Sequence, residues 1–123
     1  MTSLNNNKFG CYLPVKIDRY GSWVDGNKDM FLFSLKSNGR IGKMMKFEWK
    51  QGYGYYLDQQ SSSGLICLGY GIAIRLYKEN SKTASYCYQN NDYFDYHGIQ
   101  NALCGCNHPQ TFTPKRITVI QMI

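Results

Sequence analysis

The sequence predicts a mainly β fold, an antiparallel two-sheet β-sandwich with few short helices. Short runs of β-branched and aromatic residues recur along the chain and alternate with Gly, Asn, Asp and Ser, which is typical of strands joined by turns. No segment repeats apolar residues at a helical period over a window of about 11 residues. The chain has 123 residues, a length that suits one domain, and we expect residues 1–123 to form it without linkers or repeats.

The first expected strands lie in the N-terminal third of the chain. Residues 9–18 open the pattern, and residues 21–28 form a turn-rich connection. Residues 30–36 alternate, with apolar side chains on both faces: Phe31, Phe33 and Leu35 on one, Leu32 beside Ser34 on the other. A strand of this kind is covered at least partly on both sides.

The next strand follows a turn at residues 37–40, where Asn-Gly favours positive φ. Residues 43–50 alternate again, so Met45, Phe47 and Trp49 are expected to point inward. Residues 51–64 are rich in Gly, Tyr and Ser, and we predict a loop there.

Residues 65–77 carry the strongest apolar run, with Ile72, Ile74 and Leu76 on one face. Gly69 and Gly71 precede that stretch and indicate a close backbone approach or a bulge. The remaining expected elements are a surface loop over 79–96 with a short strand near 86–88, a helical turn over 97–102, and a closing strand over 112–122 with Ile117 and Val119 facing the core.

Charge and cysteine content suggest a location and a class of partner. Lys plus Arg total 14 and Asp plus Glu total 8, which gives a net charge of +6 and favours acidic partners. No apolar run approaches the ~20 residues of a membrane-spanning helix, and residues 1–8 lack the apolar core of a signal peptide. The five cysteines are therefore expected to be reduced thiols in a cytoplasmic protein.

Three sites of possible chemistry stand out, each with a structural alternative. Cys104, Cys106 and His108 resemble a zinc half-site, but a second half would have to come from isolated residues, and core packing explains the pair equally well. Cys87 with His97 could form a nucleophile pair, although no family signature flanks either residue. We expect no metal, no cofactor and no catalytic residues.

The third candidate site is a basic strip beside tyrosines, which could bind single-stranded nucleic acid. Its alternative is an exposed strand face whose lysines prevent edge-to-edge aggregation, and we favour that interpretation. The strip comprises Lys36, Arg40, Lys43, Lys46 and Lys50, near Tyr53, Tyr55 and Tyr56.

The order of several segments resembles the TLDc domain family. Residues 9–12 (FGCY), 21–23 (GSW) and 29–35 (DMFLFSL) are similar to the F-G-G-Y-like strand, the G-x-W turn and the D-x-x-A-F-L-F-S-L-like strand of that family. Residues 64–74 look like its glycine-rich strand region, 103–106 stand where it has L-A-G-S, and 112–122 resemble its closing strand. The positions that carry the resemblance, which we expect to be structural, are Phe9, Gly10, Trp23, Phe31, Phe33, Ser34, Gly69, Gly71 and Gly105.

The resemblance spans about residues 8–123, and the chain departs from the family in three places. The N-terminal part of the family's domain is absent, Tyr70 interrupts the glycine triplet, and Thr118 stands near an expected acidic position. The resemblance implies a two-sheet sandwich with flanking helices and without an established catalytic centre. It also implies protection against oxidative damage and regulation of the vacuolar-type proton ATPase through its peripheral sector, which would place the chain at organelle membranes through that partner.

We therefore expect a non-enzymatic protein-interaction domain of TLDc type. Exposed tyrosines make good interface anchors because they bring a large contact area at low entropic cost, although about half of these are expected in the core. The alternatives are a redox-reactive thiol protein, acting through Cys87 or Cys106, and a nucleic-acid-binding surface. The candidate anchors are Tyr53, Tyr55, Tyr56, Tyr86, Tyr88, Tyr93 and Tyr96.

Overall fold

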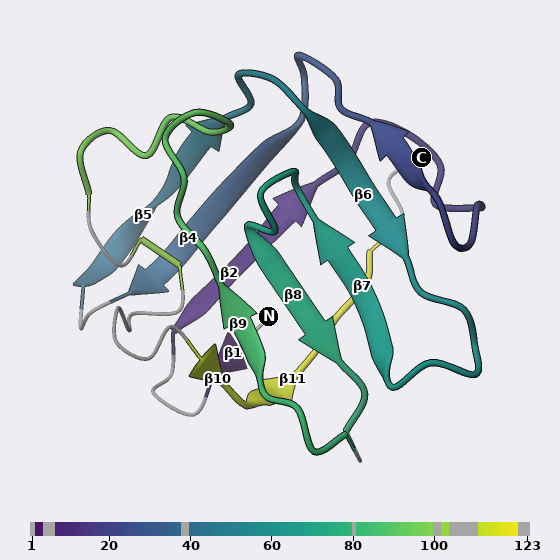
Figure 1. Cartoon of the computed structure of the whole chain (residues 1–123). Helices are drawn as coiled ribbons and strands as arrows, with labels where there is room; N and C mark the ends of the chain where they lie inside the picture. The colour runs from purple at the N-terminus through teal and green to yellow at the C-terminus, as the bar shows by residue number, and fades with distance from the viewer. Residues whose placement is uncertain are drawn as a thin grey trace.

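Two antiparallel β-sheets pack face to face in the computed structural model of the chain (Figure 1). The structure describes residues 2–3, 7–37, 40–79, 81–99, 102–103 and 111–120. One sheet has the order β11-β1-β2-β4-β5 and the other the order β10-β9-β8-β7-β6-β3. The predicted β-sandwich is confirmed, and the described residues contain no helix.

The strands of the five-stranded sheet, in its spatial order, are β11 (Pro114–Arg116), β1 (Thr2–Ser3), β2 (Lys8–Tyr12), β4 (Phe31–Ser37) and β5 (Arg40–Glu48). Those of the six-stranded sheet are β10 (Thr111–Phe112), β9 (Ser85–Cys87), β8 (Ile74–Tyr77), β7 (Gly64–Leu68), β6 (Tyr53–Leu57) and β3 (Trp23–Asp25). In the view of Figure 1, β6 to β9 lie in front of β2, β4 and β5.

The predicted alternation of β4 and β5 is confirmed. Leu32 and Ser34 of β4 face the core, and Phe31 is half-buried on the outer face. There it stacks on Tyr12, with ring centroids 5.1 Å apart. On β5, Phe47 is fully buried, and Met45 packs against the core beside it.

The prediction of a loop over residues 51–64 is wrong for residues 53–57, because these form β6. Tyr55 pairs with Leu68, Tyr56 with Cys67 and Leu57 with Ile66. Aromatic residues fit a pleated surface well, and the glycines of this segment do not end the strand. Gly54 instead allows a close approach to β3, since a Cβ there would lie 3.1 Å from the Asp25 carbonyl oxygen.

The apolar run at 65–77 divides into two strands, β7 and β8, around a tight turn. Gly69 and Gly71 have positive φ in this turn, at 80° and 73°, and so does Ile72 at 59°. Ile74 and Leu76 are buried as predicted. Ile72 lies in the turn and does not continue their face of the strand.

The end of the chain differs from the prediction. In place of a closing strand over 112–122, β10 ends at Phe112 in one sheet and β11 begins at Pro114 in the other. β11 pairs with β1, and Arg116, opposite Thr2, is the last residue of β11 in this pairing. Beyond that residue no strand continues in the described residues, and Ile117 and Val119 are 37% and 86% exposed instead of facing the core.

Two smaller predictions have different outcomes. The short strand near 86–88 is β9, so that prediction is confirmed within a residue. The helical turn over 97–102 is wrong for the described residues 97–99, which form no helix, and His97 has a positive φ of 56°.

The core lies between the sheets and is closed by the segment after β9. Phe9 of β2 and Phe112 of β10 join the sheets edge to face, with ring centroids 5.2 Å apart. Phe94 and Tyr96 follow β9 and are 1% exposed. Within the described ranges, no helix has the length and apolar character needed to cross a membrane.

Candidate interaction surface

Five aromatic rings form a connected group at the β3 end of the six-stranded sheet. Trp23 stacks on Tyr53 at 5.6 Å and meets Tyr56 at 5.5 Å. Tyr70, in the turn after β7, lies edge-on to Tyr53 at 5.1 Å and to Tyr93 at 4.9 Å. We call these residues the aromatic cluster: Trp23, Tyr53, Tyr56, Tyr70 and Tyr93.

Two glycines make this arrangement possible. Gly52 has a φ of +97°, and a Cβ there would lie 2.7 Å from the Cβ of Tyr70. Gly71 has a φ of +73°, and a Cβ there would lie 2.8 Å from the Tyr93 ring. Any other residue would strain the backbone and displace a ring, so the cluster depends on glycine at both positions.

The aromatic cluster is partly exposed. Tyr53 and Tyr70 are each 38% exposed, whereas Trp23, Tyr56 and Tyr93 are half-buried. Ring-to-ring contacts hold the exposed rings in place, so little side-chain entropy remains to be lost when a partner binds.

The predicted tyrosine anchors divide between surface and core. Tyr53, Tyr56 and Tyr93 belong to the aromatic cluster, Tyr86 is half-buried on β9, and Tyr88 is 51% exposed. Two assignments are wrong, because Tyr55 is 0% exposed and Tyr96 is 1% exposed. Tyr55 points inward from β6 and donates its hydroxyl to the Lys16 carbonyl oxygen at 3.0 Å.

Sequence reasoning missed Tyr70 as an anchor and treated it as an interruption of a glycine triplet. The useful signal was the Gly69-Tyr70-Gly71 sequence itself, because glycines on both sides of an aromatic residue indicate a turn, and turns lie at the surface. Trp23 was assigned a structural role only, and its three ring contacts place it at the centre of the cluster.

The motif residues have visible structural roles. Phe9 and Ser34 are buried. Gly10 lies against the Phe33 ring, and a Cβ at Gly10 would stand 2.6 Å from that ring. Gly69 has a φ of +80° and faces Phe94. Gly105 lies outside the described residues.

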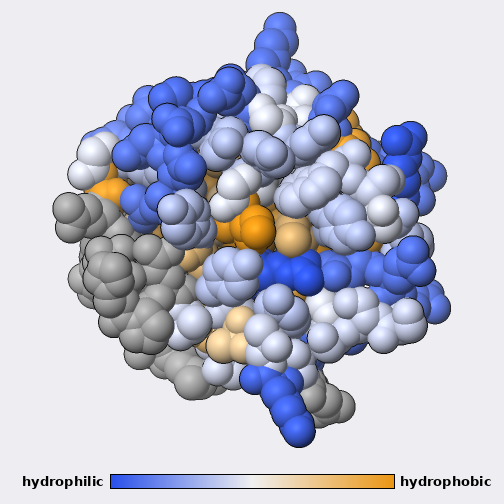
Figure 2. Space-filling view, in the orientation of Figure 1, coloured by the Kyte–Doolittle hydropathy of each residue, from blue (hydrophilic) through white to orange (hydrophobic). Residues whose placement is uncertain are grey.

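The outer face of the six-stranded sheet carries a part-buried ion pair. Tyr56, Cys67, Arg75 and Tyr86 lie opposite one another across β6 to β9. The Arg75 guanidinium binds the Asp58 carboxylate with both nitrogens and lies 4.6 Å from the Tyr77 ring centroid. In Figure 2, side chains of intermediate hydropathy cover most of this face around small apolar spots.

The described thiols are poorly suited to redox chemistry. Cys67 lies 3.0 Å from Arg75 Nη1, but burial outweighs that cation and raises the pKa of the thiol. Burial also raises the pKa of Cys11, and Cys87 is only 5% exposed. A reactive cysteine needs an accessible thiolate. Cys104, Cys106 and His108 lie outside the described residues.

The predicted basic strip is divided between the two sheets. Lys36 and Lys46 stand on β4 and β5, whereas the tyrosines of the strip stand on β6. Lys46 Nζ lies 4.2 Å from the Phe31 ring centroid, and Lys50 Nζ donates to the Asn91 carbonyl oxygen. The side chains of Arg40 and Lys43 lie outside the described part of the chain.

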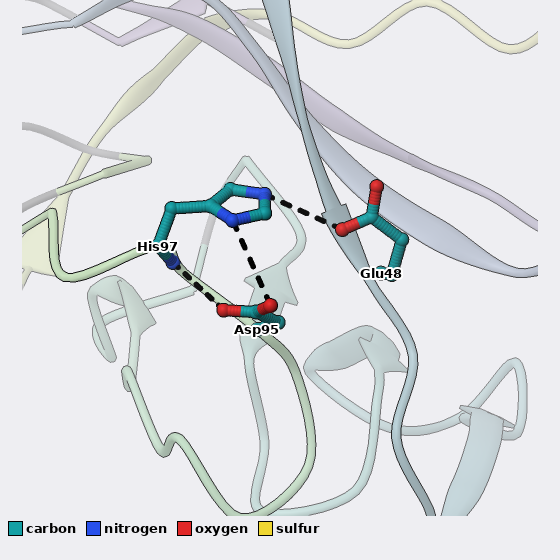
Figure 3. A group of neighbouring side chains, drawn as sticks. All are labelled: Glu48, Asp95 and His97. Atoms are coloured by element: carbon teal, nitrogen blue, oxygen red, sulfur yellow. Dashed lines mark hydrogen bonds and ion pairs between the residues drawn. The ribbon is translucent and has the colours of Figure 1, made fainter.

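A polar group stands beside the end of β5 (Figure 3). His97 lies between two carboxylates, with Nε2 3.3 Å from Glu48 Oε2 and Nδ1 3.6 Å from Asp95 Oδ2. All three side chains are exposed. The ion-pair partners of His97 among the described residues are thus two carboxylates, and Cys87, its companion in the predicted nucleophile pair, is buried on β9.

Comparisons with protein-family models, with curated proteins and with solved structures found no match to this chain.

Proposed function

We propose that this chain is a non-catalytic protein-binding domain of TLDc type and that the aromatic cluster is its docking surface. The observation that carries the proposal is the cluster itself. Its rings are partly exposed, mutually packed and supported by glycines at two turns. Trp and Tyr in such settings dominate the binding energy of many protein interfaces.

The cluster favours a protein partner because its members combine apolar rings with hydroxyl groups. Phenol and indole groups bury a large area and still provide hydrogen bonds at the rim of an interface. The net charge of +6 favours a partner with an acidic patch, because complementary charge accelerates association.

The order of the sequence motifs suggests the family, and the family in turn suggests the partner. The resemblance to TLDc domains points to the peripheral, cytosolic sector of the vacuolar-type proton ATPase, and to a role in resistance to oxidative damage. It would place the chain in the cytoplasm, at organelle membranes through this partner. The two-sheet fold is compatible with that family assignment and does not distinguish it from other β-sandwiches.

Direct binding to the purified peripheral sector tests the proposal. The full chain should bind saturably at physiological salt, and Tyr70→Ala should weaken binding by about tenfold or more, as expected for an interface anchor. Tyr12→Ala is a matched control, because Tyr12 is 36% exposed and stands on the opposite sheet.

Two outcomes separate the parts of the proposal. If the folded chain does not bind the sector, the ATPase assignment is wrong, and crosslinking from position 70 should then identify the actual partner. If Tyr12→Ala weakens binding as much as Tyr70→Ala, the aromatic cluster is not the docking surface.

A further inference from the structure

Glu48, Asp95 and His97 are held together by the backbone, although Glu48 and His97 lie 49 positions apart in the sequence. The Asp95 amide donates to the Glu48 carbonyl oxygen at 2.9 Å, and the Lys50 amide donates to the Tyr93 carbonyl oxygen at 2.8 Å. The segment after β9 therefore runs along the edge of β5. Figure 3 shows the three side chains turned toward one another from these two segments.

The protein backbone also fixes the orientation of the imidazole. His97 Nε2 lies 2.9 Å from the Lys46 carbonyl oxygen, and a carbonyl oxygen can only accept a hydrogen bond. Nε2 must therefore carry a hydrogen. In the neutral ring, Nδ1 then carries the lone pair that can bind a cation.

That lone pair faces a carboxylate oxygen. Nδ1 lies 3.6 Å from Asp95 Oδ2, which is longer than an N–H···O hydrogen bond. Asp95 Oδ1 already accepts the His97 backbone amide at 2.9 Å, so Oδ2 is the oxygen directed at the ring. Two electron-rich atoms at this separation repel each other unless a cation lies between them.

The separation suits a bound metal ion. Zinc bonds of ~2.0–2.2 Å in a tetrahedron place neighbouring ligands about 3.3–3.6 Å apart. Glu48 Oε2 lies 3.3 Å from Nε2, the other ring nitrogen, so Glu48 becomes a third ligand of an ion at Nδ1 only when its exposed side chain rotates. One ligand atom from each of the three residues lies within 4.8 Å of the others, which keeps that rotation small. The exposure of all three side chains leaves room for water in the remaining position.

We propose that Glu48, Asp95 and His97 bind a divalent cation of the zinc class, with the Lys46 carbonyl oxygen orienting His97. A mixed imidazole and carboxylate set suits such a borderline cation. A backbone acceptor on the second ring nitrogen is the usual support of a metal-binding histidine. The site is separate from the aromatic cluster and independent of the proposed function.

A proton is the competing occupant. If Nδ1 is protonated, His97 forms ion pairs with both carboxylates and leaves no lone pair for a metal. The experiment must therefore report on Nδ1 of His97 itself. It must also exclude zinc bound to thiols, because Cys104 and Cys106 can bind zinc elsewhere in the chain.

The test is a zinc titration of the full chain carrying Cys104→Ser and Cys106→Ser, at pH 7.5. Two-bond ¹H–¹⁵N spectra distinguish the ring nitrogens of the two histidines, with His108→Gln providing the assignment. We expect the Nδ1 resonance of His97 to move with added zinc and to saturate at one equivalent. In calorimetry, His97→Gln and Asp95→Asn should each weaken binding at least tenfold.

Asp92→Asn is the matched control, because Asp92 is an exposed carboxylate of the same segment and is not in the group. It should bind zinc as the parent does. The proposal is wrong if zinc leaves Nδ1 of His97 unchanged, or if Asp92→Asn weakens zinc binding as much as Asp95→Asn. A backbone amide spectrum of each variant confirms that the fold is intact.

Discussion

Arg75 and Asp58 form a two-pronged ion pair on the outer face of the six-stranded sheet, with Nη2 2.9 Å from Oδ2. Their side chains are 13% and 8% exposed. The pair links β8 to the residue that follows β6 and passes over β7 between them. The pair is part-buried although it lies outside the core, because neighbouring side chains cover it, among them Tyr77.

Removing one partner of this pair should destabilise the chain. Asp58→Asn leaves a part-buried guanidinium without its carboxylate, and we expect a loss of about 1–3 kcal/mol in the free energy of unfolding. Urea denaturation measures it. Asp29→Asn, at an exposed turn, should change stability by less than ~0.5 kcal/mol. A loss below that value for Asp58→Asn would show that the pair contributes little.

The same pair predicts how stability depends on pH. The hydrogen bond from Arg75 is the main reason that the pKa of Asp58 lies below its ordinary value. The unfolded chain therefore binds a proton at Asp58 at a higher pH, near ~3.9, than the folded chain does. The stability contributed by the pair is present above that pH and is lost as pH falls through the folded pKa.

We expect the difference in unfolding free energy between the parent chain and Asp58→Asn to shrink below about pH 4. Denaturation curves of both proteins at a series of pH values check this. A difference that stays constant through the acid range would mean that the ionised carboxylate is not what stabilises the fold.

Phe112 is expected to hold the two sheets together although it stands on a two-residue strand. It is 8% exposed and meets Phe9 across the core. Phe112→Ala should cost about 3–5 kcal/mol in unfolding free energy.

Val119→Ala tests the corrected end of the chain. Because Val119 is 86% exposed, the substitution should leave the unfolding free energy almost unchanged. A core-facing Val119 would instead give a cost above ~1 kcal/mol.

Gly69 and Gly98 form a pair for separating backbone strain from steric contact. Their φ angles are +80° and +74°, so alanine strains the backbone similarly at both, by about 1–2 kcal/mol. At Gly69 a Cβ would also stand 2.7 Å from the Phe94 ring, whereas at Gly98 nothing lies within 4 Å.

Gly69→Ala should therefore cost ~1–3 kcal/mol more than Gly98→Ala, because Phe94 is buried and cannot move aside freely. Thermal and urea denaturation of both variants provide the comparison. Equal losses would show that Phe94 adapts and that the requirement for glycine at position 69 concerns backbone conformation alone.

The sequence supported prediction of the sheets better than prediction of the surface. Alternation placed Phe47 in the core correctly because its neighbours Lys46 and Glu48 are charged. The same rule could not separate Tyr55 from Tyr56, since both are aromatic and only the pairing of β6 with β7 decides which faces inward. Glycine content concealed β6, because the reason for Gly54 is its contact with Asp25 on another strand.

The group around His97 was beyond sequence reasoning for a related reason. Glu48 and His97 meet only because the segment after β9 pairs with the end of β5. No spacing pattern encodes a contact between such distant positions. The aromatic cluster likewise combines four separate segments, so its tyrosines could be proposed as anchors but not assembled into one surface.

Tyr96 and Tyr55 provide a final comparison, since both are buried and differ in the fate of the hydroxyl. The Tyr55 hydroxyl donates to Lys16, whereas that of Tyr96 has no hydrogen-bond partner within the described residues. Burial also raises the pKa of Tyr96. A buried hydroxyl without a partner costs about 1–3 kcal/mol, so Tyr96→Phe should leave stability unchanged or increase it. Tyr55→Phe should reduce stability by about 1 kcal/mol. Urea denaturation of the two variants measures both effects, and a loss for Tyr96→Phe as large as that for Tyr55→Phe would show that the Tyr96 hydroxyl is hydrogen-bonded in solution.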